Sequence, residues 1–318
     1  MSDRTDTFII GTRGSRLATT QSGLVRDLLA ELHGRDGLEV ILETIRTSGD
    51  VNRGSLSEIG GQGLFTAEIE RALLDGRIDL AVHSLKDLPT QTHADLQLVA
   101  TPERADVRDV LVTREPVDGF HGDGINHLSE GALLGTGSPR RVAQLASVRP
   151  DLRFADIRGN VDTRLRRVKE GDLDGVVLAA AGLHRLSLQD EISSYLDTEH
   201  VLPAPGQGAL GLQMRRGDAR LSLVEPLHHA ATWAGVEAER SLLKTLGGGC
   251  RAPIAAWGRL EGGRLRLEGA VALPDGSRLC RTALQGDPAA AAALGSDLAA
   301  ELRRQGADDI LALTTATP

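Results

Sequence analysis

The chain has 318 residues, a formal net charge of −8 and 2% aromatic residues. Its length allows two or three domains, each with its own hydrophobic core. The negative charge argues against general nucleic-acid binding, and so few aromatic residues cannot form a platform that stacks single-stranded bases.

The N-terminus and the cysteines indicate where the protein works. Residues 1–7 lack the charged-then-apolar pattern of a signal peptide, and no apolar run reaches the length of a membrane span. Two cysteines, Cys250 and Cys280, are too few for a disulfide framework. We therefore expect a cytoplasmic protein with neither a membrane partner nor a nucleic-acid partner.

The first lobe is predicted to comprise residues 1–104 together with residues 202–222. Its opening part alternates strands at 8–11, 38–43 and 79–83 with helices at 17–32 and 66–74. Strands that alternate with helices in this way are typical of a mostly parallel sheet with crossover helices.

The second lobe is predicted over residues 105–201 and repeats this pattern. Its strands are expected at 109–113, 132–136, 153–157 and 175–179, and its helices at 139–148 and 161–169. Polar residues at 101–106 and a Pro/Gly-rich stretch at 202–208 would carry the chain between the lobes. Two α/β lobes joined by two crossings predict a fold like that of periplasmic binding proteins, with mostly parallel sheets flanking a cleft that opens and closes.

From residue 223 to residue 318 we predict a small C-terminal α+β domain. A helix at 237–244 leads into a glycine loop, and two hairpin signals at 261–263 and 274–276 separate strand-like stretches. An alanine-rich helix at 288–304 and a last strand at 310–313 complete the domain.

Arginine accounts for 33 of the 36 basic residues and gathers at turns that follow predicted strands. These arginines are Arg13, Arg140, Arg141, Arg158, Arg164 and Arg185. Turns at the carboxyl ends of parallel strands line the ligand crevice of open α/β sheets, and a guanidinium group binds carboxylate or phosphate with two hydrogen bonds. Four such turns predict a bound polyanion. The chain lacks a Walker-type Gly-Lys-Ser/Thr sequence, which argues against a nucleotide.

Two further residues have the chemistry of a functional group. Cys250 follows three glycines and precedes Arg251, whose charge favours the reactive thiolate, and the alternative is a small buried residue in a tight loop. Asp87 follows His83 and Ser84 at the end of a strand, where it is either a turn residue or an acid that stabilises a cation and moves protons. No Ser/His/Asp spacing indicates a hydrolase, and Cys250 has no neighbouring His or Cys with which to bind a metal.

Seven segments of the chain resemble the porphobilinogen deaminases, also called hydroxymethylbilane synthases. In chain order they are TRGS at 12–15, GGQGLF at 60–65, VHSLKD at 82–87, SPRR at 138–141, RGNV at 158–161, LPAPGQG at 202–208 and GGC at 248–250. They follow the order of the family and span nearly the whole chain, so together they are far more specific than any single motif.

The resemblance implies a transferase of tetrapyrrole and heme biosynthesis. It would add four porphobilinogen molecules in turn to a dipyrromethane cofactor and then hydrolyse off the linear product, hydroxymethylbilane. Cys250 would hold the cofactor through a thioether, and Asp87 would be the catalytic carboxylate that stabilises the cationic azafulvene formed when ammonia leaves. The other cofactor-binding residues would be Lys86, Ser84, Ser138, Arg140, Arg141, Arg158 and Arg164. Porphobilinogen would be bound by Arg13, Arg185, Gln21 and Phe65.

We expect no metal and a monomer. Two residues depart from the family pattern: Gln62 stands where lysine is frequent, and Gly247 stands where an acidic residue is common. Neither belongs to the core set, so we expect activity. Two other functions stay open. An anion-binding module without catalysis would give no role to Cys250 or Asp87, and a cysteine-nucleophile acyl transferase would need a histidine near Cys250.

Overall fold

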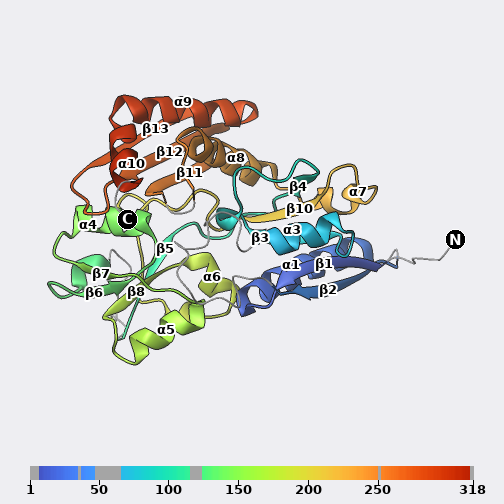
Figure 1. Cartoon of the computed structure of the whole chain (residues 1–318), viewed down its shortest axis with the longest axis horizontal. Coiled ribbons are helices and arrows are strands. Elements are labelled where there is room, and N and C mark those ends of the chain that lie inside the picture. The colour runs from blue at the N-terminus through green and yellow to red at the C-terminus, as the bar shows by residue number, and fades with distance from the viewer. Residues whose placement is uncertain (1–6, 35–36, 47–65, 115–123, 250–251, 316–318) are drawn as a thin grey trace. The chain divides into compact units, whose positions relative to one another are not determined.

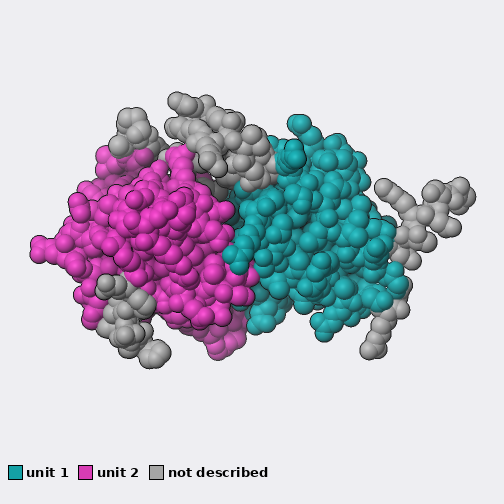
Figure 2. Space-filling model, turned by 90° about the horizontal axis from the view of Figure 1, so that it is seen from below, with its two compact units in different colours: residues 1–104, 209–233 teal, residues 105–208, 234–318 magenta. Residues whose placement is uncertain are grey.

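The computed structural model describes residues 7–34, 37–46, 66–114, 124–249 and 252–315 (Figure 1). The chain forms two compact units, residues 1–104 with 209–233 and residues 105–208 with 234–318 (Figure 2). It therefore passes from one unit to the other after Arg104, after Gly208 and after Trp233. Within the described residues, no helix combines the length and the apolar character that a membrane span requires.

The first unit is built on a five-stranded sheet with the order β2-β1-β3-β10-β4. Its elements are β1 (Thr7–Arg13), α1 (Arg16–His33), β2 (Glu39–Ile45), α3 (Ala67–Leu74), β3 (Leu80–Ser84), β4 (Leu96–Ala100), β10 (Leu210–Arg215) and α7 (Leu221–Val224). Strand β1 runs parallel to β2 and β3, whereas β10 runs antiparallel to β3 and β4. The predicted parallel strands and crossover helices of this lobe are confirmed.

Local sequence explains most of this unit. Phe8 and Ile10 alternate along β1 and are fully buried with Val25 and Leu29 of α1. Ser15 caps α1 by accepting a hydrogen bond from the backbone N–H of Ala18. No pattern in the sequence predicts β4 or β10. All but the last residue of β10 are buried in the interior of the sheet, so no alternation of polar and apolar residues marks it.

The second unit contains a five-stranded sheet with the order β7-β6-β8-β5-β9. Its elements are β5 (Asp109–Thr113), β6 (Leu133–Gly135), α4 (Pro139–Val148), β7 (Arg153–Ala155), α5 (Val161–Lys169), β8 (Gly175–Ala179), α6 (Ala180–Arg185) and β9 (Ser194–Tyr195). Strand β6 is parallel to β7 and β8, whereas β5 is antiparallel to β8 and β9. The predicted bounds of α4 and α5 are confirmed. Pro139 stands in the first turn of α4, and the Asn160 side chain caps α5.

The same unit holds the predicted C-terminal hairpins as an antiparallel sheet, β11-β12-β13. The elements here are α8 (Ala230–Thr245), β11 (Ile254–Glu261), β12 (Arg264–Ala272), β13 (Leu279–Gly286), α9 (Ala291–Arg304) and α10 (Ala307–Thr315). Leu242 of α8 and Leu298 of α9 pack with Leu267 of β12 in one core, and Leu202 packs against Ala255 and Ala270 in another. The predicted fold class, two parallel-rich α/β lobes and a small α+β region, is confirmed.

The last predicted strand is wrong, because residues 310–313 lie inside α10. Gln305 is the C-cap of α9, and the next residue, Gly306, has a φ of +95°. Ala307 and Ile310, three residues apart, are both fully buried, which is the spacing of a helix face. A short apolar run does not by itself distinguish a strand from a buried helix.

Candidate functional site

One group of predicted site residues lies where strands of the first unit end. Arg13 is the last residue of β1, and Ser84 is the last residue of β3, which runs parallel to β1. Lys86 and Asp87 follow Ser84 in a single 3-10 turn, Leu85–Asp87. Because the carboxyl ends of parallel neighbours meet at one edge of a sheet, β1 and β3 deliver these residues to the same edge.

Gln21 reaches this edge from α1. Its side chain is buried, and Nε2 donates a hydrogen bond to Ser84 Oγ at 3.0 Å. The structure thus brings together two predicted site residues that are 63 positions apart in the chain. The amide fixes the orientation of the Ser84 hydroxyl at the end of β3.

The side chains of Asp87 and His83 differ in burial and in hydrogen bonding. The Asp87 carboxylate is exposed, and it forms no hydrogen bond or ion pair with any other residue that the structure describes. Its oxygens can therefore accept hydrogen bonds from the N–H groups of a ligand or stabilise a nearby cation. His83 is buried and hydrogen-bonded through Nε2 to Gln213 Oε1 at 2.9 Å, and Gln213 in turn donates to Glu70. Of these two, Asp87 is the group available for chemistry.

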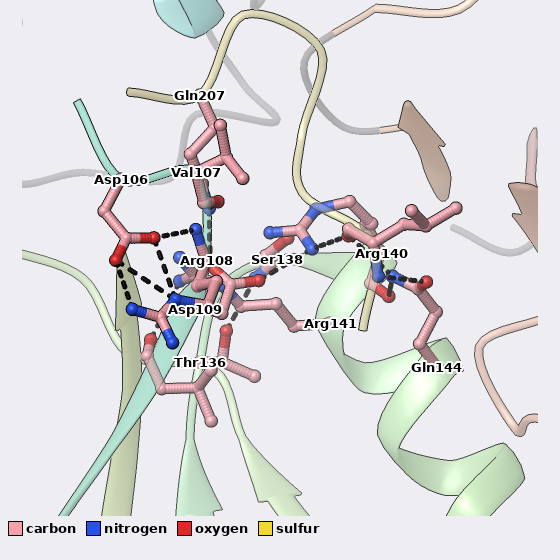
Figure 3. Close-up of polar contacts among 12 residues, drawn as sticks. Asp106, Val107, Arg108, Asp109, Thr136, Ser138, Arg140, Arg141, Gln144 and Gln207 are labelled. Carbon is pink, nitrogen blue, oxygen red and sulfur yellow. Dashed lines mark hydrogen bonds and ion pairs between the residues drawn. The ribbon is translucent and has the colours of Figure 1, made fainter. Parts of the chain in front are cut away.

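A second group of predicted residues lies at the start of α4 in the second unit. Arg140 and Arg141 are 3% and 6% exposed. Arg140 Nη1 forms an ion pair with Asp109 Oδ2 at 2.8 Å, and Arg141 Nη2 donates to Asp109 Oδ1 at 2.7 Å (Figure 3). Each guanidinium also donates to a backbone carbonyl, Arg140 to that of Leu202 and Arg141 to that of Val177. The protein itself thus engages part of each arginine.

Charge is not balanced within this cluster. Burial acts to raise the pKa of Asp109, but the two guanidinium charges outweigh it and hold the pKa well below its usual range. Burial lowers the pKa of Arg140, and the neighbouring Arg141 lowers it further. Two guanidiniums face one carboxylate, and Nε of each arginine is buried without a hydrogen-bond partner among the described residues. The cluster therefore has the capacity to bind one further anion.

Ser138 stands just before this helix, at the N-cap of α4. Its backbone N–H donates to Thr136 Oγ1 at 3.3 Å, while its side chain makes no capping hydrogen bond. Most N-cap serines use their hydroxyl to bind a backbone N–H of the first turn. The Ser138 hydroxyl is not used in this way.

Arg158 and Arg164 flank the start of α5 and are more accessible. Arg158 is exposed, and its Nη2 lies 3.6 Å from Asp156 Oδ2. Arg164 Nε donates to the Gly159 carbonyl at 3.0 Å, and Asn160 Oδ1 accepts from the N–H of Thr163. Both guanidiniums thus lie at a helix N-terminus, where anions are favoured.

Arg185, the last residue of α6, is the clearest anion-binding candidate. Its Nη2 donates to the Gly208 carbonyl at 2.7 Å, and burial lowers its pKa to about 10. It therefore stays charged at neutral pH. No carboxylate among the described residues pairs with it. A half-buried guanidinium without an acidic partner matches a ligand carboxylate.

Asp109 belongs to the arginine cluster but was not among the predicted site residues. Asp109 is the first residue of the predicted strand 109–113, and its side chain is fully buried. An acidic residue that opens an otherwise apolar strand is a usable signal, because a buried carboxylate needs a cationic partner. Gln207, in the Pro/Gly-rich crossing, was likewise not assigned a contact, and its Nε2 donates to Asp109 Oδ1 at 2.8 Å.

Cys250 and Phe65, and also Gln62, lie outside the described residues. The glycines before Cys250 are described in part. Gly247 has a φ of +70° and donates to the carbonyl of Lys244, so it ends α8 in a left-handed cap. An acidic side chain at this position would be strained by the positive φ.

Within the described ranges, no group of three or more His, Cys, Asp and Glu side chains is arranged to hold a metal ion. In the first unit, the exposed carboxylate of Asp87 lies close in the chain to Ser84, and in the second unit arginines gather near Ser138. Guanidinium and hydroxyl groups can bind an anionic ligand, and a carboxylate can stabilise positive charge.

Comparison with known proteins covers nearly the whole chain. A family model described as "Porphobilinogen deaminase, dipyromethane cofactor binding domain" matches residues 8–222, and one described as "Porphobilinogen deaminase, C-terminal domain" matches residues 233–304. A porphobilinogen deaminase from Syntrophobacter fumaroxidans is 47% identical over 304 residues, or 95% of this chain and 96% of that protein. Another from Syntrophotalea carbinolica is 48% identical over 311 residues, or 97% and 96% of the two chains. Among solved structures, the periplasmic VFT2 domain of BvgS from Bordetella pertussis covers 70% of this chain and 86% of that domain, with 16% identity and a TM-score of 0.40.

Proposed function

The chain belongs to the porphobilinogen deaminase family, and we infer that it condenses four porphobilinogen molecules head to tail, with release of ammonia, and then hydrolyses off hydroxymethylbilane. The observation that carries this function is the match of two family models to residues 8–222 and 233–304. Relatives with this name also align over nearly their full length. An anion-binding module without catalysis is not favoured.

The cofactor of the reaction is a dipyrromethane, which supplies the primer that each new pyrrole extends. We propose that Cys250 holds it covalently and that the side chains of Lys86, Ser84, Ser138, Arg140, Arg141, Arg158 and Arg164 bind its acetate and propionate groups. The described residues fit a polycarboxylate. The cluster of Arg140, Arg141 and Asp109 has one positive charge in excess, both buried Nε groups lack a described partner, and the Ser138 hydroxyl makes no cap bond.

Porphobilinogen would be bound by the remaining guanidiniums and amides. Each porphobilinogen carries two carboxylates, so a lengthening product needs a growing number of cationic partners. Arg185 supports this role because it is charged, half-buried and without an acidic partner among the described residues. Arg13 is the last residue of β1, and Gln21 of α1 is hydrogen-bonded to Ser84 at the end of β3. Phe65 completes the proposed set.

Asp87 is the proposed catalytic group. Loss of ammonia leaves a delocalised positive charge on the substrate, and a nearby carboxylate lowers the energy of that charge. Bond formation at the acceptor pyrrole then releases a proton from carbon, which Asp87 can accept and pass to solvent. The exposed position of Asp87 and its freedom from described partners support this assignment.

The intact mass of the purified protein tests the function. We expect an added mass equal to two linked pyrrole rings, and its loss in Cys250→Ser. An unmodified chain from a host replete in porphobilinogen contradicts the proposal. For Asp87 we expect that Asp87→Asn keeps the melting temperature and lowers kcat by about 10²–10⁴, and near-normal turnover would remove Asp87 from this role.

We propose that the protein acts as a cytoplasmic monomer and that its domains are residues 1–104 with 202–222, residues 105–201 and residues 223–318. Light scattering at micromolar concentration tests the monomer, and limited proteolysis tests the boundaries, since cleavage concentrates in exposed linkers.

A further inference from the structure

The carboxylate of Asp109 connects three parts of the second unit. It engages Arg140 and Arg141 at the start of α4, and Gln207 Nε2 donates to its Oδ1 at 2.8 Å (Figure 3). Gln207 Nε2 also donates to the carbonyl of Val107 at 2.8 Å. Two of these partners are cofactor-binding candidates, whereas Gln207 is not.

The chain position of Asp109 and Gln207 is unusual. Asp109 lies four residues after Ala105, where the chain enters the second unit, and Gln207 lies one residue before Gly208, where it leaves. Gly208, with a φ of +84°, approaches the other crossing so closely that a Cβ would lie 2.6 Å from the carbonyl oxygen of Ala105. The Ala105 N–H also donates to the Gly208 carbonyl at 3.2 Å. The entering and leaving segments are thus held side by side, and the Asp109 carboxylate lies against both.

The geometry of the carboxylate decides what Arg140 and Arg141 can bind. Each oxygen of Asp109 faces a different guanidinium, so neither arginine is paired in the two-bond manner that a carboxylate and an arginine favour. Gln207 occupies a further lone pair of Oδ1 and so holds the carboxylate in this shared orientation. Without it, Asp109 could rotate to pair fully with one arginine, and the arrangement of the two guanidiniums would be lost.

We propose that Asp109 and Gln207 are positioning residues that hold Arg140 and Arg141 in place to bind one carboxylate of the porphobilinogen-derived chain. This inference rests on the proposed function. Neither Asp109 nor Gln207 touches the ligand. Their effect is on ligand affinity, and it should therefore appear in KM and in the rate of covalent loading, not in the chemical step.

Gln207→Leu tests the proposal, with Gln144→Leu as the matched control. Both glutamines are buried, and both donate to a backbone carbonyl, Gln207 to that of Val107 and Gln144 to that of Leu202 at 3.1 Å. The Gln207 side chain also donates to Asp109 Oδ1, whereas the Gln144 side chain bonds the backbone of Leu202 and the carbonyl of Arg140. Gln144→Leu removes buried hydrogen bonds to the backbone near Arg140 but keeps the contact to Asp109, whereas Gln207→Leu removes the contact to the carboxylate.

Three measurements are made on each variant: melting temperature, steady-state kinetics of the holoenzyme, and the rate at which apoprotein gains the dipyrromethane mass on incubation with porphobilinogen. For Gln207→Leu we expect KM to rise about tenfold and loading to slow by a similar factor, with kcat within about twofold, because a hydrogen bond to a charged group is lost. Gln144→Leu should show a comparable fall in melting temperature with KM and loading unchanged.

Two outcomes overturn the proposal. Either Gln207→Leu keeps the wild-type KM and loading rate, or KM rises equally in both variants. If Gln207→Leu does not fold, Gln207→Asn, which keeps the amide but shortens its reach, must show the same rise in KM. A wild-type chain that never gains the added mass would instead refute the proposed function, whatever the ratio between the variants.

Discussion

The turns that precede α4 and α5 carry the same kinds of residue and place them in different environments. Both turns follow parallel neighbours in one sheet, β6 and β7, and both combine a polar N-cap with nearby arginines. At α4, Arg141 is 6% exposed and bonded to Asp109. At α5, 46% of the Arg158 side chain is exposed, and its acidic neighbour Asp156 is only two residues away.

The difference comes from residues that are distant in the sequence. Asp109 and Leu202 reach the start of α4 from 32 and 62 positions away. They bury the arginines and compensate part of their charge. The contact of Arg158 with Asp156 is local and solvated. Turns with similar residues thus produce one pair of guanidiniums held by the protein and one guanidinium exposed at the surface. The difference lies in tertiary burial.

The largest expected effect is on stability, and it separates the two turns directly. Asp109→Asn should lower the free energy of unfolding by about 3–5 kcal/mol, because it leaves two buried guanidiniums without a carboxylate. Asp156→Asn, the matched change at the other turn, should cost less than about 1 kcal/mol because its ion pair is exposed. Urea denaturation followed by circular dichroism measures both. Equal losses would mean that burial does not distinguish the turns.

The pH dependence of unfolding also tests the ion pairing of Asp109. Although burial opposes it, Arg140 and Arg141 hold the pKa of Asp109 below its ordinary value, so the unfolded chain binds a proton at a higher pH than the folded one. The stabilisation is fully present above about pH 4 and falls as the pH drops further. We therefore expect the difference in unfolding free energy between wild type and Asp109→Asn to shrink below about pH 4. A difference that stays constant down to pH 3 would contradict the ion pairing.

Features that depend on local contacts can be predicted from the sequence, whereas features that depend on distant contacts cannot. Pro139 and Asn160 mark helix starts by their own chemistry, and the bounds of α4 and α5 were predicted correctly. The arginines were located at turns, but their burial depends on Asp109, which no local pattern connects to them. Residues 310–313, which lie in α10, are predicted as a strand because four apolar residues in a row show no helical periodicity.

A third test concerns ligand binding by the exposed turn. Arg158→Ala should raise KM for porphobilinogen about tenfold, since a charge-assisted hydrogen bond to a carboxylate is lost. Its melting temperature should stay within about 2 °C of wild type because the contact with Asp156 is solvated. Arg167→Ala is the control, as Arg167 is also partly exposed on α5 and pairs with Asp172. An unchanged KM in Arg158→Ala, or an equal rise in Arg167→Ala, would place the binding function elsewhere.

The smallest expected effects lie at the two N-caps, and they should be reciprocal. The Asn160 side chain bonds the N–H of Thr163 at 2.9 Å, whereas the Ser138 side chain makes no cap bond. Asn160→Ala should therefore lower the free energy of unfolding by about 1 kcal/mol. Ser138→Ala should leave it within about 0.5 kcal/mol and instead slow loading of apoprotein by porphobilinogen several-fold, because its hydroxyl is free to bind a ligand carboxylate. If Ser138→Ala loses as much stability as Asn160→Ala and loads at the wild-type rate, Ser138 serves the helix and not the ligand, and the start of α4 would bind anions through its arginines alone.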